Sequence, residues 1–208
     1  MKIDPAGVPF IVGALALGVI AGVLVSWTLV VPGVALAAIF LFFFRDPDRR
    51  PLAGSHLVLS PADGRVLVAG AAEPGVAPAG EWKQISIFLS PMNVHVNRIP
   101  ASGRVTQVLY KRGRFLPAYH AHAAAANERS EVWIDHDGQP IVARQVVGVL
   151  ARRVVCRLQP GAEVRAGDRY GVMKFGSRMD VFLPVTAEIR VQIGDEVRAA
   201  ESLIAVLH

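Results

Sequence analysis

The sequence predicts a mainly β protein, a sandwich-like barrel with two similar halves, preceded by an N-terminal hydrophobic helical hairpin. Three observations support this fold class. Residues 10–44 are almost continuously apolar and carry no charge. From Leu57 onward, short runs rich in β-branched residues alternate with Gly, Pro and Asp, which is typical of strands and turns. Two segments of this second part recur within it, which indicates two similar halves.

The apolar stretch is too long for a single membrane helix of about 20 residues. A Ser-Trp pair at 26–27 and a Pro-Gly pair at 32–33 interrupt it, so we expect two short helices, over residues 9–24 and 29–44. A secretory signal peptide is disfavoured because the apolar part is long and no clear small-residue cleavage site ends it. The sequence leaves open whether the pair spans the bilayer or is peripheral and monotopic, dipping into one leaflet.

Basic residues flank this stretch on both sides: Lys2, Arg45, Arg49 and Arg50. Positive charge at both outer ends predicts that both lie on the cytoplasmic side of a cell membrane, with the remaining domain on that face. The arginines suit anionic head groups as well as they suit a simple stop to insertion. We therefore expect a membrane-associated segment, residues 1–50, and a β-rich domain, residues 51–208.

The β-rich part is predicted from its β-branched runs. The expected strands are, in order, residues 57–59, 65–69, 84–89, 104–110, 131–134, 141–158 and 181–191. The segment Asp135-His136-Asp137-Gly138 has the composition of a hairpin turn. Residues 121–129 form the one helix-like stretch.

Two internal repeats support the barrel. Residues 61–66, Pro-Ala-Asp-Gly-Arg-Val, return as residues 100–105, Pro-Ala-Ser-Gly-Arg-Val, and residues 161–168 return in similar form at 194–201. The second pair resembles the turn of biotinyl and lipoyl carrier domains, in which two similar halves interlock into a flattened barrel. We expect a similar barrel here, as one domain, because no long linker is evident.

The charge balance is basic, since 22 Lys and Arg face 17 Asp and Glu for a net charge of +5. Such a balance suits anionic lipid, an acidic substrate or nucleic acid. Nucleic acid is the least supported and we expect none, because the chain has no dense basic run and no aromatic-basic alternation. The single cysteine, Cys156, cannot form a disulfide within the chain and indicates a reducing compartment.

The Gly176-Ser177 pair is the candidate for backbone chemistry. It lies between two β-like runs, with charged residues on both sides. The Ser177 hydroxyl can attack the carbonyl of Gly176 and move the acyl group from nitrogen to oxygen. β-Elimination then leaves dehydroalanine, which tautomerises and hydrolyses to a pyruvoyl group. Taken alone, however, a Gly-Ser pair is usually an ordinary turn.

Other candidate residues each have a structural and a chemical interpretation. Asp63 follows a predicted strand and either makes a turn or orients a base for Ser177. His95 either has its ring satisfied by the backbone or moves protons near neutral pH. His120 and His122 lack a third ligand for zinc, so we expect no metal.

Five segments, taken together, resemble the short form of the phosphatidylserine decarboxylases. They follow the family's order along the chain, at residues 43–47, 60–64, 89–100, 127–129 and 175–180. The chain departs from the longer enzymes at Arg98, where they carry a second histidine that partners the aspartate in self-cleavage. The base for self-cleavage is therefore open: His95 serves both steps, or Asp63 acts with another group.

The resemblance implies a proenzyme that cuts itself between Gly176 and Ser177. A β chain, residues 1–176, and an α chain, residues 177–208, then stay associated. The cofactor is a covalent pyruvoyl group derived from Ser177, with neither pyridoxal phosphate nor metal. Its carbonyl forms a Schiff base with the amine of phosphatidylserine in the membrane, carbon dioxide leaves, and phosphatidylethanolamine is released.

Carried over by position, Ser177 is the pyruvoyl precursor, Asp63 the activating aspartate and His95 the histidine linked to decarboxylation. The candidates for the substrate head group are Arg98, Lys174 and Arg178. Two alternatives stay open. One is a pyruvoyl-dependent decarboxylase of another amine-bearing substrate, such as a free amino acid, and the other is a non-enzymatic, membrane-anchored adaptor with a biotinyl-like domain. Homo-oligomerisation is left open as well.

Overall fold

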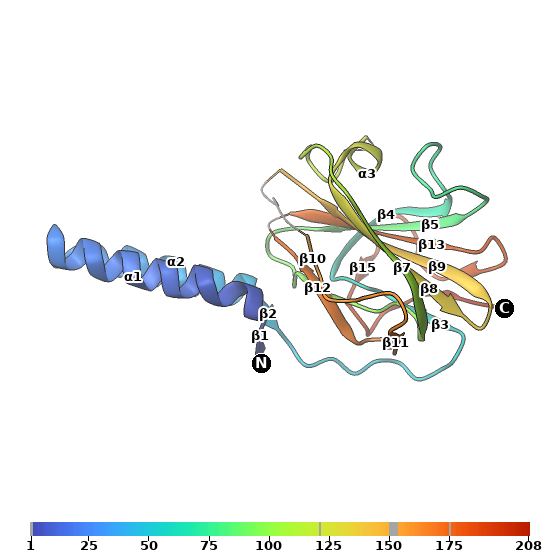
Figure 1. Ribbon diagram of the computed structural model, residues 1–208, viewed down its shortest axis with the longest axis horizontal. Helices are drawn as coiled ribbons and strands as arrows, with labels where there is room; N and C mark the ends of the chain where they lie inside the picture. The colour runs from blue at the N-terminus through green and yellow to red at the C-terminus, as the bar shows by residue number, and fades with distance from the viewer. Residues whose placement is uncertain (1, 121, 150–153, 175) are drawn as a thin grey trace. The chain divides into compact units, whose positions relative to one another are not determined.

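The computed structural model describes residues 2–120, 122–149, 154–174 and 176–208 (Figure 1). The chain divides into two compact units, Met1–Asp48 and Arg49–His208. Each unit has its own secondary structure, helical in the first and mostly β in the second.

The N-terminal unit is a helical hairpin, as predicted. Its elements are β1 (Lys2–Ile3), the 3-10 helix η1 (Pro5–Gly7), α1 (Val8–Leu24), the 3-10 helix η2 (Trp27–Leu29), α2 (Val30–Phe43) and β2 (Arg45–Asp46). Figure 1 shows α1 and α2 side by side, and β1 pairs with β2 at the base of the hairpin. The helices approach closely at two glycines, because a Cβ on Gly33 would lie 2.6 Å from Gly18 Cα.

The hairpin is apolar on its outside as well as between its helices. Large exposed side chains along it include Leu17, Val23 and Val31. Among the described residues, Pro5–Leu24 is the one helix long and apolar enough to cross a membrane, and Trp27–Phe43 is a shorter apolar helix. A helical surface of this kind is stable in lipid rather than in water.

The C-terminal unit consists of three antiparallel sheets and one short helix, α3 (Ala123–Ala126). Its strands are β3 (Leu57–Leu59), β4 (Gly64–Ala71), β5 (Lys83–Leu89), β6 (Val96–Arg98), β7 (Gly103–Lys111), β8 (Arg129–His136), β9 (Gln139–Val147), β10 (Val154–Cys156), β11 (Glu163–Val164), β12 (Arg169–Met173), β13 (Ser177–Leu183), β14 (Glu188–Ile189), β15 (Glu196–Val197) and β16 (Leu203–Val206). The large curled sheet has the order β11-β7-β8-β9-β13-β5-β4-β15, and the small sheets are β10-β12-β6 and β14-β16-β3.

The internal repeats correspond to two similar halves. In one half Gly64 begins β4 and pairs with Val197, and in the other Gly103 begins β7 and pairs with Val164. Both glycines are needed for a close approach, because a Cβ would lie 2.1 Å from Phe88 O in the first half and 2.2 Å from a backbone oxygen of β8 in the second. Strands β6 to β12 thus repeat β3 to β5 together with β13 to β16, and the predicted two-half barrel is confirmed.

The core lies on one face of the large sheet. Met179, Val181 and Leu183 of β13 point into it, together with apolar residues of β5, β8 and β9. The residues between them, such as Phe182, point to the opposite face and pack elsewhere. Ser177 lies two residues before Met179 on β13, so its side chain points to the same face of the sheet, the core face.

Three predicted elements differ from the structure. The helix-like stretch 121–129 contains only the four-residue α3, because Asn127 is extended and its side chain bonds to the loop at Leu116. The long strand predicted at 141–158 is two strands, β9 and β10, separated by residues that are partly outside the described ranges. The strand predicted at 181–191 begins at Ser177 and ends at Leu183, with β14 as a separate strand, and β6 and β12 were not predicted.

Candidate active site

The Gly176–Ser177 bond lies between β12, in the small sheet β10-β12-β6, and β13, near the centre of the large sheet. Gly176 has φ +68, in the left-handed region that favours glycine. Ser177 begins β13 and pairs with Leu89 on one side and with Val147 on the other. It is fully buried, and its Oγ has no hydrogen-bond partner within the described ranges. A buried polar atom without a hydrogen-bond partner calls for an explanation, which makes Ser177 a candidate functional residue.

The carbonyl of Gly176 packs closely against a second glycine, Gly148. Gly148 follows β9, directly after the pairing partner of Ser177. A Cβ on Gly148 would lie 2.0 Å from Gly176 O and 3.0 Å from Gly176 C. Only a glycine therefore allows the backbone after β9 to pack against the carbonyl that precedes Ser177.

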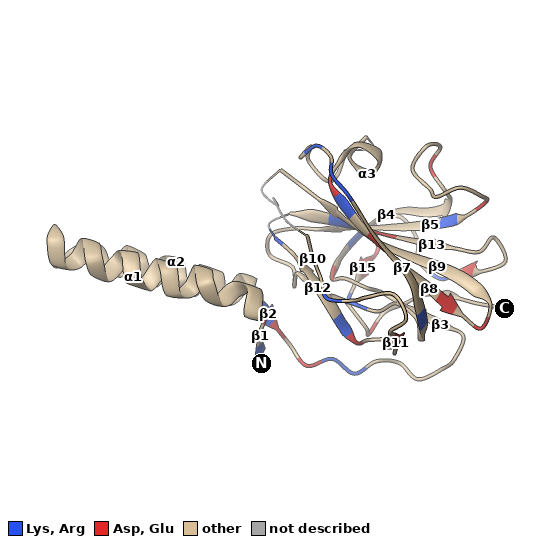
Figure 2. Ribbon diagram, in the orientation of Figure 1, with Lys and Arg blue, Asp and Glu red and all other residues tan. Residues whose placement is uncertain are grey.

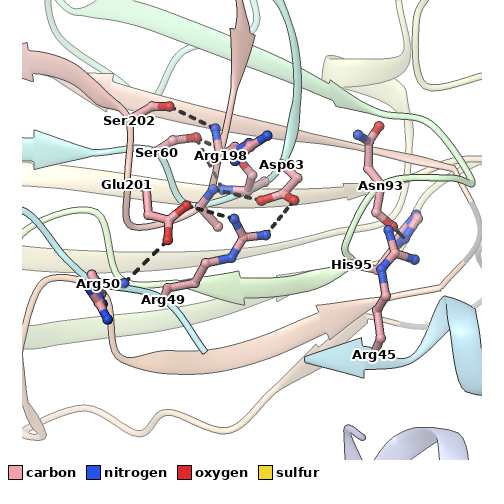
Figure 3. Close-up of polar contacts among 12 residues, drawn as sticks. Arg45, Arg49, Arg50, Ser60, Asp63, Asn93, His95, Arg198, Glu201 and Ser202 are labelled. Carbon is pink, nitrogen blue, oxygen red and sulfur yellow. Dashed lines mark hydrogen bonds and ion pairs between the residues drawn. The ribbon is translucent and has the colours of Figure 1, made fainter. Parts of the chain in front are cut away.

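His95 lies beside the chain that leads into this bond. It precedes β6, is fully buried, and its carbonyl accepts a hydrogen bond of 3.2 Å from Met173 N at the end of β12. Its Nδ1 lies 2.9 Å from Asn93 O (Figure 3). Since a carbonyl only accepts, Nδ1 carries the proton, and in the neutral ring Nε2 is the basic nitrogen.

Glu128 lies in the same row across the large sheet as Ser177. Ser177 pairs with Val147, whose N–H donates to Glu128 O over 3.1 Å, so the three side chains point to one face. Two inter-strand steps separate the Glu128 and Ser177 backbones by about 10 Å. Glu128 is 7% exposed, and its Oε1 has no hydrogen-bond partner in the part of the chain that the structure describes.

Two buried amide side chains link the Ser177 face of the large sheet to the small sheet β10-β12-β6. Gln145, on the Ser177 face of β9, donates to Asn97 Oδ1 on β6 over 2.8 Å. Both are fully buried, and Gln145 Oε1 and Asn97 Nδ2 find no partner among the described residues. The Ser177 end of the core is therefore polar and incompletely hydrogen-bonded, while the rest is apolar.

The sequence did contain a signal for Glu128. Val132 and Ile134 are core residues, and period-two alternation carried back through Ser130 reaches Glu128. The helix predicted over residues 121–129 includes Glu128, and a helix does not place alternate residues on opposite faces, so Glu128 was not predicted to face the core. No comparable signal marks Gly148, because its contact with Gly176 depends on which strands become neighbours.

Asp63 lies one strand beyond the partner of Ser177, at the start of β4, and is engaged by other groups. Arg49 Nη2 donates to Asp63 Oδ2 over 2.7 Å, and Ala199 N donates to Oδ1 over 2.8 Å. Figure 3 shows the Arg49 guanidinium bridging Asp63 and Glu201. None of the described contacts of Asp63 reaches Ser177.

The three head-group candidates lie in different surroundings. Lys174 is half-buried, directly after β12 and next to the Gly176–Ser177 segment. Arg98, at the far end of β6, is three residues or roughly 10 Å along the strand from His95. It donates to Gly167 O over 3.0 Å and borders a separate cavity of about 450 Å³.

Arg178 requires a correction. It follows Ser177 on a strand, so its side chain points to the opposite face of the sheet. There it is buried and donates to Asp180, Glu73 and Ser86. Burial alone would lower the pKa of Arg178, but the two carboxylates outweigh it and raise that pKa. Arg178 is thus used by the fold and is not directed towards a head group at Ser177.

Within the described ranges, no cluster of three or more His, Cys, Asp or Glu side chains is arranged to hold a metal ion. The side-chain groups described above are a hydroxyl, an imidazole, a carboxylate and amides. These groups suffice for acyl transfer and proton transfer.

Comparison with known proteins identifies relatives along the whole chain. The family model described as phosphatidylserine decarboxylase matches residues 36–205. A phosphatidylserine decarboxylase proenzyme from Nitrosomonas europaea is 38% identical over 203 residues, covering 97% of this chain and 94% of the relative. Proteins of the same name from Mycobacteroides abscessus and Prosthecochloris aestuarii are 41% and 43% identical, covering 99% and 80% of this chain and 87% and 76% of theirs.

Proposed function

The chain belongs to the phosphatidylserine decarboxylase family and is an enzyme of that family, and on this premise we propose that it decarboxylates phosphatidylserine through a pyruvoyl group made from Ser177. The observation that carries the proposal is the buried, unpartnered Ser177 Oγ, which follows a glycine of positive φ whose carbonyl packs against Gly148. Membership of an enzyme family removes the support for a non-enzymatic adaptor.

Self-cleavage begins at the Ser177 hydroxyl. Its Oγ attacks Gly176 C, its proton passes to a base, and the peptide nitrogen leaves as an amine, so that an ester joins the two residues. Removal of the Ser177 Cα proton then expels the Gly176 carboxylate and leaves dehydroalanine. Tautomerisation and attack by water release ammonia and leave a pyruvoyl group at the start of the α chain.

His95 is the base that the geometry favours for these steps. Its ring is fixed by the hydrogen bond to Asn93, and its backbone is joined to Met173, four residues before Ser177. Asp63 is held by Arg49 and by a backbone amide. We therefore assign the proton transfers to His95 and to Asp63 the task of fixing the strands beside the site.

The pyruvoyl carbonyl would supply the electron sink for loss of carbon dioxide from the lipid amine. The chain's own residues bind and orient the substrate around it. The buried carboxylate of Glu128 offers the negative charge that an ammonium group needs when it leaves water. Lys174 stays the nearest candidate for the negatively charged head group, with Arg98 a more distant one.

The two chains would stay together after the cut. The α chain contributes β13, which pairs with β5 and β9 of the β chain. It also contributes β15, which pairs with β4, and β16, which pairs with β3. The N-terminal helices would hold the β chain in the membrane that contains the substrate, with the catalytic unit on the cytoplasmic face.

The test compares the wild-type chain with Ser177→Ala, using phosphatidylserine in vesicles and free serine as substrates. We expect the wild type to split and to release carbon dioxide from the lipid alone, and Ser177→Ala to stay whole and inactive. As a control, Gln139→Ser adds a third Gly-Ser pair to those at 54–55 and 176–177 and places it in an exposed hairpin, and we expect it to add no fragment. A Ser177→Ala chain that splits, or a wild type that uses free serine and ignores the lipid, would contradict the proposal.

A further inference from the structure

An apolar opening of about 220 Å³ lies beside Gly176. Its lining includes the side chains of Phe88, Pro117, Ala118 and Tyr119. Phe88 directly precedes Leu89, the pairing partner of Ser177. Gly176 itself lines the opening, so the opening reaches the residue whose carbonyl belongs to the proposed cleavage site, and none of its described lining residues is charged.

Large apolar side chains at this opening are exposed to solvent. Tyr119 is 61% exposed and Val149 is 52% exposed, and both line the opening. Phe115, two residues before the lining residue Pro117, is 40% exposed. We call Phe115, Tyr119 and Val149 the apolar rim. Exposed apolar residues grouped around a pocket are characteristic of an interaction surface.

Basic residues lie next to the rim. Lys111, Arg112 and Arg114 are exposed in the segment that leads to Phe115. Figure 2 shows this basic group where β7 runs into the loop before α3. Aromatic side chains flanked by Lys and Arg fit the surface of an anionic bilayer, because the rings enter the interface while the cations meet the head groups.

We propose that the apolar rim inserts into the surface of an anionic lipid bilayer. The lipid then enters the opening with its head group towards Gly176, which lines it, while its acyl chains remain in the membrane. This inference rests on the proposed function, since it takes phosphatidylserine as the substrate. It adds a contact of the catalytic unit itself with the membrane, distinct from the N-terminal helices.

The test uses the full chain, reconstituted in vesicles of phosphatidylcholine and phosphatidylglycerol, with Tyr119→Ser as the variant. Long-chain phosphatidylserine in the same vesicles is compared with dibutanoyl phosphatidylserine dissolved in water. We expect kcat/KM for the vesicle substrate to fall about tenfold, as expected for loss of one apolar anchor. Activity on the dissolved substrate should fall much less, and splitting of the chain should stay unchanged.

The matched control is Ile193→Ser, because Ile193 is 69% exposed and does not line the opening. It should change neither activity. Tyr119 also contacts Phe88 with a ring-centroid distance of 6.0 Å, so Phe115→Ser provides a second rim variant without that contact to the wall, and the same selective loss is expected.

Equal loss on both substrates by the two rim variants would overturn the proposal, because the rim would then shape the catalytic pocket. Unchanged activity on both would overturn it as well, since another partner would have to cover the rim. A wild type inactive on both substrates would refute the proposed function itself, which is a distinct result.

Discussion

The two halves of the barrel close their equivalent hairpins in different ways. β8 runs into β9 through the two-residue turn Asp137-Gly138, and His136 pairs with Gln139. β5 and β13 pair in the same manner, with Leu89 opposite Ser177, but the chain between them contains the entire second half. Gly176 and Ser177 are thus the counterparts of the turn glycine and of Gln139.

The comparison separates backbone conformation from chemistry. Gly138 has φ +85 and Gly176 has φ +68, so both peptides follow a left-handed glycine. An added Cβ would meet no atom within 4 Å at either glycine. The turn at Gly138 is exposed, however, whereas Ser177 is buried and the Gly176 carbonyl packs against Gly148. Both sites thus have a glycine with positive φ, but of the two the Gly176–Ser177 site is buried and has its carbonyl packed against another residue.

The same pairing relates two histidines. His56 precedes β3 and its carbonyl accepts from Leu207 N over 2.9 Å, as the carbonyl of His95 accepts from Met173 N over 3.2 Å. His56 is exposed and His95 is fully buried. The repeated fold therefore gives His95 and Gly176 counterparts in the other half of the barrel, His56 and Gly138, and a substitution at the counterpart serves as a control.

The largest effect is expected from His95→Ala. Loss of a positioned proton-transfer group should slow splitting of the chain by about 10² to 10⁴, as measured by time courses on denaturing gels, and the release of carbon dioxide from the lipid should fall with it. His56→Ala, the counterpart, should retain near wild-type activity. Similar losses in the two variants would mean that the histidines have a shared structural role and would remove His95 from the site.

The next effect is expected from Gly148→Ala. The new methyl group would displace the Gly176 carbonyl, and a misplacement of about 1 Å slows a reaction by roughly 10². Time courses of splitting on denaturing gels would measure this. Gly138→Ala should cost about 1 kcal/mol of stability at its left-handed turn and leave splitting unchanged, so a wild-type rate in Gly148→Ala would contradict the assigned role of the Gly176 carbonyl contact.

The smallest effect is expected from Glu201→Gln, which tests the ion-pair cluster around Asp63. Burial acts to raise the pKa of Glu201, but hydrogen bonds from Arg49 and Arg50 N outweigh it and hold that pKa below the ordinary 4.5. A depressed carboxyl pKa adds stability above the ordinary value, and this stability is lost as the pH falls through the lower, folded-state pKa.

Thermal unfolding would follow this dependence. At neutral pH, Glu201→Gln should be less stable than wild type by at most about 1 kcal/mol, since the pair is partly exposed. The difference should shrink as the pH is lowered below 4.5. A difference that is largest in acid would show that Glu201 is not stabilised as a carboxylate.

The sequence was sufficient for the parts of this comparison that are local. The repeated Pro-Ala-Asp/Ser-Gly-Arg-Val segments predict two halves, the Asp137-Gly138 pair predicts a hairpin turn, and the sequence around Gly176-Ser177 indicates a candidate cleavage site. The partners of Asp63 were not predictable, because Ala199 and Arg49 meet it only after distant strands pair. Arg178 was wrongly expected at the substrate head group. The strand was predicted to begin at residue 181, so the prediction did not say to which face of the sheet the Arg178 side chain points.

The most direct test of self-cleavage is the intact mass of the purified wild-type protein under denaturing conditions. The account predicts two chains, residues 1–176 and 177–208, with the smaller one lighter by one ammonia than a chain with N-terminal serine. A single unbroken polypeptide of 22.3 kDa, with an ordinary serine at position 177, would contradict it.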